Sequence, residues 1–157
     1  MKLLMVCMGN ICRSPMMEGW LAHALAQDAR LAGYQVDSAG IGAWHAGQPP
    51  DPRAVATAAR HGVDISMQRA RQLRATDFGD FDLILFADAD TLADGRARAR
   101  GQGAAASHRY LDWADVEGGR DIADPYYGDA RDFEQAWRDI AIGGERILQR
   151  LLREGAA

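Results

Sequence analysis

The chain has 157 residues, of which 48% are hydrophobic and 25% charged, the balance of a globular domain with a proper core. We therefore expect one domain over residues 1–157. The net charge of −4 argues against general nucleic-acid binding, which depends on a strongly basic face or tail.

The chain begins with an apolar run, residues 3–8, that resembles the start of an export signal but is too short to be one. It meets Arg13 before an apolar region of about 7–15 residues can form, and no later segment approaches the roughly 18 apolar residues of a membrane span. We therefore expect a cytoplasmic protein with reduced thiols and no membrane partner.

The first predicted elements are a strand, a helix and a second strand. Residues 2–6 are almost wholly apolar, as in a strand buried on both faces of a parallel sheet. Ser14 before Pro15 predicts a helix start with Ser14 as N-cap, and helical spacing continues to Gly33. A second strand is expected around residues 34–37, followed by a long polar loop that contains Trp44.

The rest of the chain continues this alternation. We expect helices over residues 53–60, 91–100 and 129–153, a buried strand over 81–87, and a short strand near 109–111 before a turn-rich stretch. The pattern predicts an α/β fold, a doubly wound four-stranded parallel sheet with helices on both faces and a phosphate-binding loop after the first strand. Ligands of such sheets bind beyond the carboxyl ends of the strands.

At that edge stands a cysteine, five residues, an arginine and a serine, from Cys7 to Ser14. If this segment curls around an oxyanion, its N–H groups point inward and the next helix adds positive charge. Gly9 and Asn10 suit the turn, and Arg13 can hold two phosphate oxygens in a bidentate fork. The same field favours a nucleophilic thiolate on Cys7, to which Ser14 can donate a hydrogen bond.

Other readings of these residues are less favoured. A lone cysteine at a strand end is usually structural, but here it occurs in order with a Gly-Asn turn, Arg, Ser and Pro. The four histidines show no metal-ligand spacing, and the chain has no Walker A motif. We expect no metal ion and no cofactor.

Residues 6–15, Val-Cys-Met-Gly-Asn-Ile-Cys-Arg-Ser-Pro, resemble the signature of the low-molecular-weight protein tyrosine phosphatases. The likeness covers nearly the whole chain, with further matching segments at residues 37–40, 44–45, 61–63, 70–72, 81–84, 118–121 and 124–128. It implies a metal-independent hydrolase of phosphotyrosine monoesters that forms a cysteinyl-phosphate intermediate on Cys7. The implied phosphate-binding loop comprises Met8, Gly9, Asn10, Ile11, Cys12 and Ser14, with Arg13 as the phosphate clamp.

This chemistry needs a carboxyl group that protonates the leaving oxygen and then activates water. The resemblance assigns both tasks to Asp124, although an Asp before Pro can simply start a turn. A phosphotyrosine ring needs a cleft with aromatic walls, for which Trp44, Tyr126 and Tyr127 are suited. The resemblance points to Trp44 and Tyr126; Tyr127 could equally be a core contact, and Trp44 an exposed loop residue.

Supporting residues also follow from the resemblance. Asn10 and Ser38 are expected to hydrogen-bond the loop into shape. Gln68 stands where a His that supports the loop Asn is expected, and an amide can replace an imidazole as a hydrogen-bond partner. Thr91 stands where an Asn often follows the third main strand.

Cys12 lies in the same loop as Cys7, within disulfide reach after modest backbone movement. Similar proteins form a reversible bond there, so we predict that Cys12 is the redox partner that protects Cys7 from over-oxidation. A passive packing role is the alternative.

Two rival functions share this loop. An arsenate reductase with a thiol relay needs a further cysteine pair, and no cysteine follows Cys12. A non-catalytic phosphotyrosine-binding or redox-sensing module has no need of Asp124. The substrate implied is a phosphotyrosine-containing protein, for example a tyrosine kinase, with inorganic phosphate as product.

Overall fold

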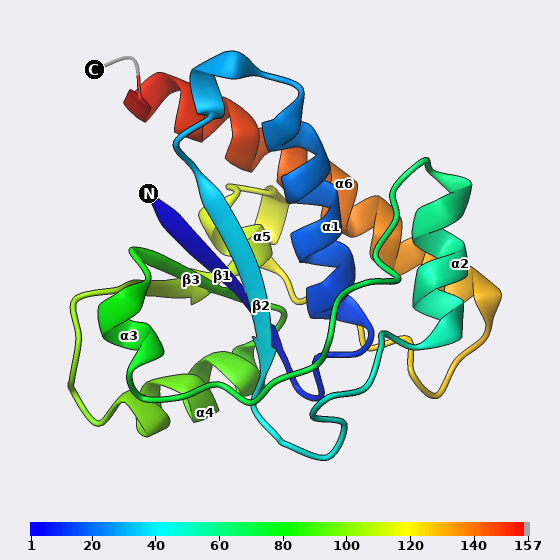
Figure 1. The fold of residues 1–157 in the computed structure, drawn as a ribbon, viewed down its shortest axis with the longest axis horizontal. Helices are drawn as coiled ribbons and strands as arrows, with labels where there is room; N and C mark the ends of the chain where they lie inside the picture. Colours follow the sequence, from blue (N-terminus) through cyan, green and yellow to red (C-terminus); the bar gives the residue numbers. More distant parts are fainter. Residues whose placement is uncertain (156–157) are drawn as a thin grey trace.

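A computed structural model describes residues 1–155, which contain a four-stranded, all-parallel sheet in the order β2-β1-β3-β4 (Figure 1). The strands are β1 (Lys2–Cys7), β2 (Gln35–Gly40), β3 (Leu83–Phe86) and β4 (Ala106–Arg109). The helices are α1 (Arg13–Ala26), α2 (Pro52–Arg60), α3 (Asp77–Asp80), α4 (Ala89–Ala99), α5 (Tyr110–Trp113) and α6 (Ala130–Gly155), with 3₁₀ turns η1 (Ala29–Leu31) and η2 (Glu117–Gly119). The predicted doubly wound parallel sheet is confirmed.

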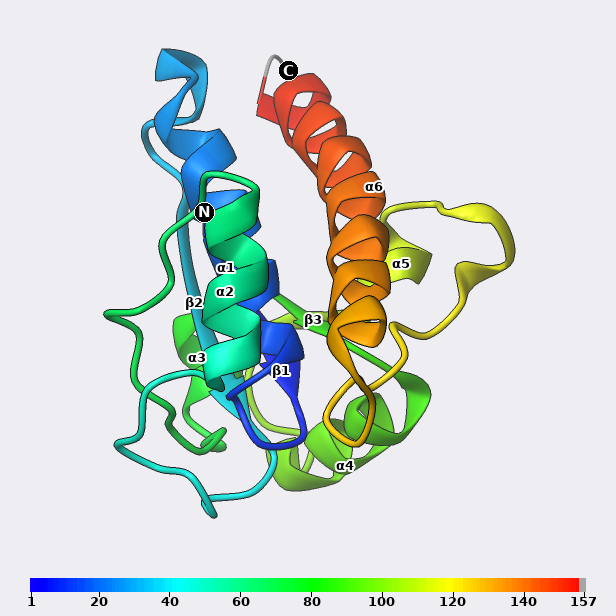
Figure 2. The same ribbon diagram turned by 90° about the vertical axis from the view of Figure 1, so that its right-hand side faces the viewer.

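The central strand β1 contributes to two cores. Its residues Leu3 and Met5 pack into the cluster that includes the buried faces of α1 and α6, whereas Leu4 and Val6 pack into the cluster that includes α3 and α4. Figures 1 and 2 show α1, α2 and α6 on one side of the sheet and α3 and α4 on the other. Because successive side chains of a strand point to opposite faces, both cores require β1 to be apolar throughout.

Two predicted boundaries were wrong, and one short helix was not predicted. The helix expected to reach Gly33 ends at Ala26, and η1 follows it. The short helix α3 was not expected. The strand expected near residues 109–111 ends at Arg109, and Tyr110 starts α5. The Tyr110 side chain is fully buried and donates a hydrogen bond to the carbonyl of Ile140 in α6, 2.8 Å away, which holds this segment against α6 rather than in the sheet.

The strand register brings the ends of three strands together. Cys7, the last residue of β1, pairs with Gly40 of β2, and Val6 pairs with Phe86 of β3. The segments that follow β1 and β3 therefore leave the sheet at one edge, next to the end of β2. Within residues 1–155, no helix combines the length and the apolar character needed to cross a membrane.

Candidate active site

Residues 7–14, called here the Cys7–Ser14 loop, turn tightly between β1 and α1. Asn10 adopts a left-handed conformation with φ of 58°, which Asn tolerates better than most residues. A Cβ atom on Gly40 would lie 2.9 Å from the main-chain nitrogen of Asn10, so only glycine lets β2 approach the loop this closely. This contact explains why β2 ends in a glycine.

Carbonyl oxygens of the loop are hydrogen-bonded to the surrounding protein, whereas most of its N–H groups, among the described residues, are not. The carbonyl oxygens of Cys7, Met8 and Ile11 accept hydrogen bonds from the segments outside the loop, from the N–H groups of Ile41, Gly42 and Asp51. Within residues 1–155, the N–H groups of residues 8–12 donate to no protein acceptor. These N–H groups are available to an oxyanion, as the loop sequence predicts.

Helix α1 begins at Arg13 with Cys12 as its N-cap, and no side chain caps it. The prediction that Ser14 caps this helix was therefore wrong. The Ser14 hydroxyl is instead 3.0 Å from the Cys7 sulfur, and its oxygen accepts a hydrogen bond of 2.8 Å from Asn10. The uncapped N-terminus leaves its N–H groups and their partial positive charge directed at the loop.

The side chain of Asn10 holds the loop together. Its Nδ2 group donates to the hydroxyl oxygens of Ser14, at 2.8 Å, and Ser38, at 3.0 Å, while its Oδ1 atom accepts from the N–H of Arg71 at 3.0 Å. Because the Ser14 oxygen accepts from Asn10, the Ser14 proton is left for another acceptor. The nearest acceptor is the Cys7 sulfur at 3.0 Å, and the carbonyl of Ala39 lies farther away at 3.4 Å.

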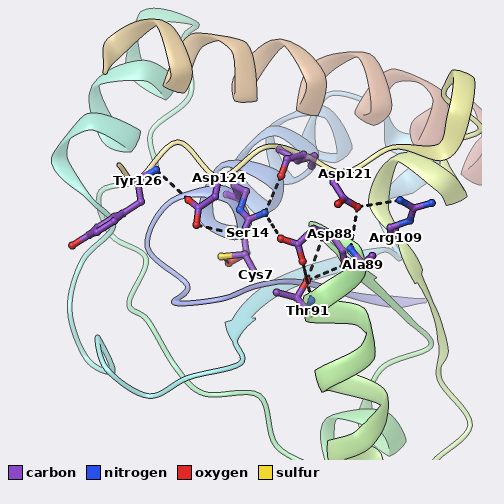
Figure 3. A network of polar contacts seen from close by, with 11 residues as sticks. Cys7, Ser14, Asp88, Ala89, Thr91, Arg109, Asp121, Asp124 and Tyr126 are labelled. Carbon is purple, nitrogen blue, oxygen red and sulfur yellow. Dashed lines mark hydrogen bonds and ion pairs between the residues drawn. The ribbon is translucent and has the colours of Figure 1, made fainter. Parts of the chain in front are cut away.

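Arg13 is buried, and one of its nitrogens is anchored. Nη1 donates to the Asp88 carboxylate at 2.7 Å and to the carbonyl of Ile122 at 2.8 Å (Figure 3). Burial opposes the charge of Arg13, but Cys7 and then Asp88 hold its pKa above the ordinary value. Nε and Nη2 make no hydrogen bond within residues 1–155, so this edge of the guanidinium can bind two oxygens in a fork.

Asp88 lies at the N-cap of α4 and has two tasks. One carboxylate oxygen binds Arg13, and the other accepts from the N–H and the hydroxyl of Thr91, both at 2.8 Å. Burial raises the pKa of Asp88, but the Thr91 N–H and Arg13 outweigh it and lower that pKa. Thr91, where an Asn was expected, thus completes a capping box that fixes the partner of Arg13.

The loop forms the floor of a cleft of about 340 Å³, lined also by Trp44, His45, Asp124, Tyr126 and Tyr127. The Asp124 carboxyl is half-exposed; one oxygen lies 3.7 Å from Nη2 of Arg13, and the other accepts from the N–H of Tyr126 (Figure 3). Tyr127 is 94% exposed, so its alternative reading as a core contact was wrong. The cleft thus combines a cysteine, an arginine, a carboxyl group and aromatic walls.

The two cysteines of the loop have different environments. Both are free thiols that line the cleft. Burial, and then the nearby Asp51 carboxylate, raise the pKa of Cys12 far above its ordinary value, so this thiol stays protonated at neutral pH. Among residues 1–155, a hydroxyl lies within hydrogen-bond distance of the Cys7 sulfur but not of the Cys12 sulfur.

Gln68 does not support the loop as expected. Its amide nitrogen donates to the carbonyl of Pro15 at 3.0 Å, and the Arg71 main chain takes the place beside Asn10. Sequence reasoning also missed Asp88, although an acidic residue just after a buried strand was a usable signal. Among residues 1–155, no three His, Cys, Asp or Glu side chains gather as a metal site requires.

Comparisons with known proteins agree with this geometry. Residues 2–157 match the family model described as low molecular weight phosphotyrosine protein phosphatase. A low molecular weight protein-tyrosine-phosphatase of Streptomyces coelicolor is 41% identical over 151 residues, covering 94% of this chain and 91% of that one.

Solved structures give the same result. The crystal structure of YfkJ from Bacillus subtilis has a TM-score of 0.90 at 34% identity, covering 98% of this chain and 96% of that one. The Drosophila arginine phosphatase DARP has a TM-score of 0.88 at 31% identity, covering 96% of this chain and 97% of that one. The chain therefore belongs to the low molecular weight phosphotyrosine protein phosphatase family.

Proposed function

We propose that this chain acts as a single catalytic domain, residues 1–157, that hydrolyses phosphotyrosine monoesters through a cysteinyl-phosphate intermediate. The observation that carries the proposal is the position of the Cys7 sulfur, 3.0 Å from the Ser14 hydroxyl, on the floor of a cleft that Arg13 and Asp124 also line. A nucleophile, an oxyanion clamp and a proton donor are the parts that phosphoryl transfer needs.

In the first step the Cys7 thiolate attacks phosphorus, so that an S–P bond forms and the bond to the tyrosine oxygen breaks. The N–H groups of residues 8–12 and the Nε and Nη2 atoms of Arg13 hold the three equatorial oxygens. Asp124, at the rim of the cleft, gives its proton to the departing phenolate oxygen. Positioning and charge stabilisation supply most of the rate enhancement.

In the second step a water molecule attacks the phosphocysteine. Asp124, now ionised, takes a proton from that water while the new O–P bond forms and the S–P bond breaks. The Ser14 hydroxyl donates to the departing Cys7 sulfur, whose negative charge it stabilises. Inorganic phosphate leaves, and the thiolate is regenerated.

The walls of the cleft favour an aromatic phosphoester. Trp44 is 69% exposed beside the floor, and Tyr126 packs edge-on against Tyr127, with ring centroids 4.9 Å apart. Flat rings on both sides suit the ring of phosphotyrosine. We expect phosphotyrosine-containing proteins, among them a tyrosine kinase, as substrates, in the cytoplasm where Cys7 stays reduced.

The test is hydrolysis of p-nitrophenyl phosphate and of a phosphotyrosine peptide under reducing conditions without added metal. Cys7→Ser and Arg13→Ala should abolish activity, and Asp124→Ala should reduce it strongly, whereas Asp94→Ala, at an exposed carboxyl of α4, should not change it. A peptide with phosphoarginine tests the activity named for the Drosophila neighbour.

Other outcomes would identify a rival function. A wild type that binds phosphotyrosine peptide but releases no phosphate would be a binding or redox-sensing module. Reduction of arsenate without phosphatase activity would identify an arsenate reductase. Faster hydrolysis of phosphoarginine than of phosphotyrosine would overturn the substrate proposed here.

A further inference from the structure

The hydrogen-bonded chain behind Cys7 continues past the loop to a carboxyl group. Ser38, which accepts from Asn10, donates its own hydroxyl proton to Oε1 of Glu18 at 2.8 Å. Glu18 lies on α1, within the helix that follows the loop. An unbroken series of hydrogen bonds therefore joins the Cys7 sulfur, through Ser14, Asn10 and Ser38, to the Glu18 carboxyl.

The charge of Glu18 determines how firmly this chain is oriented. A carboxylate can only accept hydrogen bonds, so ionised Glu18 accepts one from the Ser38 hydroxyl. The Ser38 oxygen is then left to accept a hydrogen bond from Asn10. Asn10 then presents its second amide hydrogen to Ser14, whose proton points to the sulfur. A protonated Glu18 can donate to Ser38 instead or accept only weakly, because charge-assisted hydrogen bonds are about twice as strong as neutral ones.

The surroundings of Glu18 leave its charge poorly compensated. The nearest charged groups are Asp37 of β2, which opposes ionisation, and Arg71, which favours it but is already bound to both carboxylate oxygens of Asp77 at 3.0 and 3.2 Å. His23 and Asp64 line a surface cavity that Glu18 also lines. Burial, more than these charges, raises the pKa of Glu18 to about 7.

Gln68 stands at the position where a His was expected, so the side chain here is an amide that cannot become a cation. Gln68 lines the same cavity as Glu18, and its Oε1 atom is buried without a hydrogen-bond partner within residues 1–155. An amide cannot carry a proton as an imidazole can, so it does not hold Glu18 in the ionised form. Glu18 is therefore free to change its charge near neutral pH.

We propose that Glu18 is a positioning residue, whose ionised carboxylate orients Ser38 and Asn10, and through Ser14 the Cys7 thiolate. Protonation of Glu18 then lowers activity without any contact between Glu18 and the substrate. The inference rests on the proposed role of Cys7 as nucleophile.

The test compares wild type, Glu18→Gln and Glu145→Gln in two assays across neutral pH. One assay is kcat for p-nitrophenyl phosphate; the other is the rate of Cys7 alkylation by iodoacetamide, with the adduct located by mass spectrometry. In the wild type both should rise about three- to tenfold as Glu18 ionises near pH 7, because a charge-assisted hydrogen bond is about 1 kcal/mol stronger than the neutral bond it replaces.

The matched variants separate the outcomes. Glu18→Gln keeps an acceptor for Ser38 but cannot ionise, so the rise should disappear, while Glu145→Gln, at an exposed carboxyl of α6, should keep it. Ser38→Ala cuts the link while Glu18 stays, and should also lose the rise; it serves as the test if Glu18→Gln does not fold. A rise that persists in Glu18→Gln or in Ser38→Ala would overturn the proposal. The alkylation assay needs no phosphatase activity. A protein that is not a phosphatase can therefore still show whether Glu18 controls the reactivity of Cys7, and the two proposals can fail separately.

Discussion

Replacing Asp88 with Asn should remove the ion pair with Arg13 while it keeps the cap of α4. Asn is as good an N-cap as Asp, and its Oδ1 atom can keep the hydrogen bonds from Thr91. Its amide group, however, would face Nη1 of Arg13, where the carboxylate oxygen now accepts at 2.7 Å. Two donors would then oppose each other, and the buried guanidinium would lose its counter-ion.

The cost follows from the burial of the two partners. Removing one partner of a fully buried pair costs about 3–5 kcal/mol. Here the Asp88 side chain is 19% exposed, and Arg13 keeps its bond to Ile122, so we expect about 2–3 kcal/mol in the free energy of unfolding. Asp88→Ala should cost about 1 kcal/mol more, because it also removes the cap.

The assay is urea unfolding of the three proteins as a function of pH, together with kcat. The folded-state pKa of Asp88 is lowered, so its stabilising effect is present at neutral pH and is lost as pH falls below the ordinary carboxyl range of about 4 and through the folded-state pKa. The difference in the free energy of unfolding between wild type and Asp88→Asn should shrink as pH falls through the same range. We also expect kcat to fall at least about tenfold, because Arg13 is no longer held in place. Equal stability at pH 7 with unchanged kcat would refute this account of the ion pair.

Three further changes test other parts of the site. Ser14→Ala should lower kcat about ten- to hundredfold and give a burst of p-nitrophenol, since it removes a hydrogen bond worth about 1.5–3 kcal/mol to the departing sulfur. As pH rises from 4 to 8, wild type should lose about 3 kcal/mol of stability relative to Glu18→Gln in thermal unfolding. The pKa of Glu18 is raised by burial from 4.5 to about 7, so its contribution is fully present below 4.5 and is lost as pH passes 7. Cys12→Ser should regain less activity than wild type when dithiothreitol follows hydrogen peroxide; equal recovery would exclude Cys12 as the redox partner.

Local sequence determined the parts of this protein that depend on neighbouring residues. The apolar run that forms β1 and the spacing from Cys7 to Arg13 predicted a strand followed by an anion-binding loop, because backbone geometry and residue type suffice for that inference. The alternation of strands and helices predicted a parallel sheet, since parallel strands need crossover helices. The resemblance added Asp124 and the aromatic walls of the cleft.

Only the tertiary structure decided which distant groups orient these residues. Arg13 and Asp88 are 75 positions apart and meet because β1 and β3 pair in parallel register, so that the segments after them leave the same edge of the sheet. Glu18 joins the site through Ser38 because α1 packs against β2. Hydrogen bonds act over about 3 Å, so their partners depend on packing that no local pattern encodes. Ser14 is a further example. Its sequence position predicted a helix cap, but in the folded loop its hydroxyl lies beside the buried Cys7 sulfur instead.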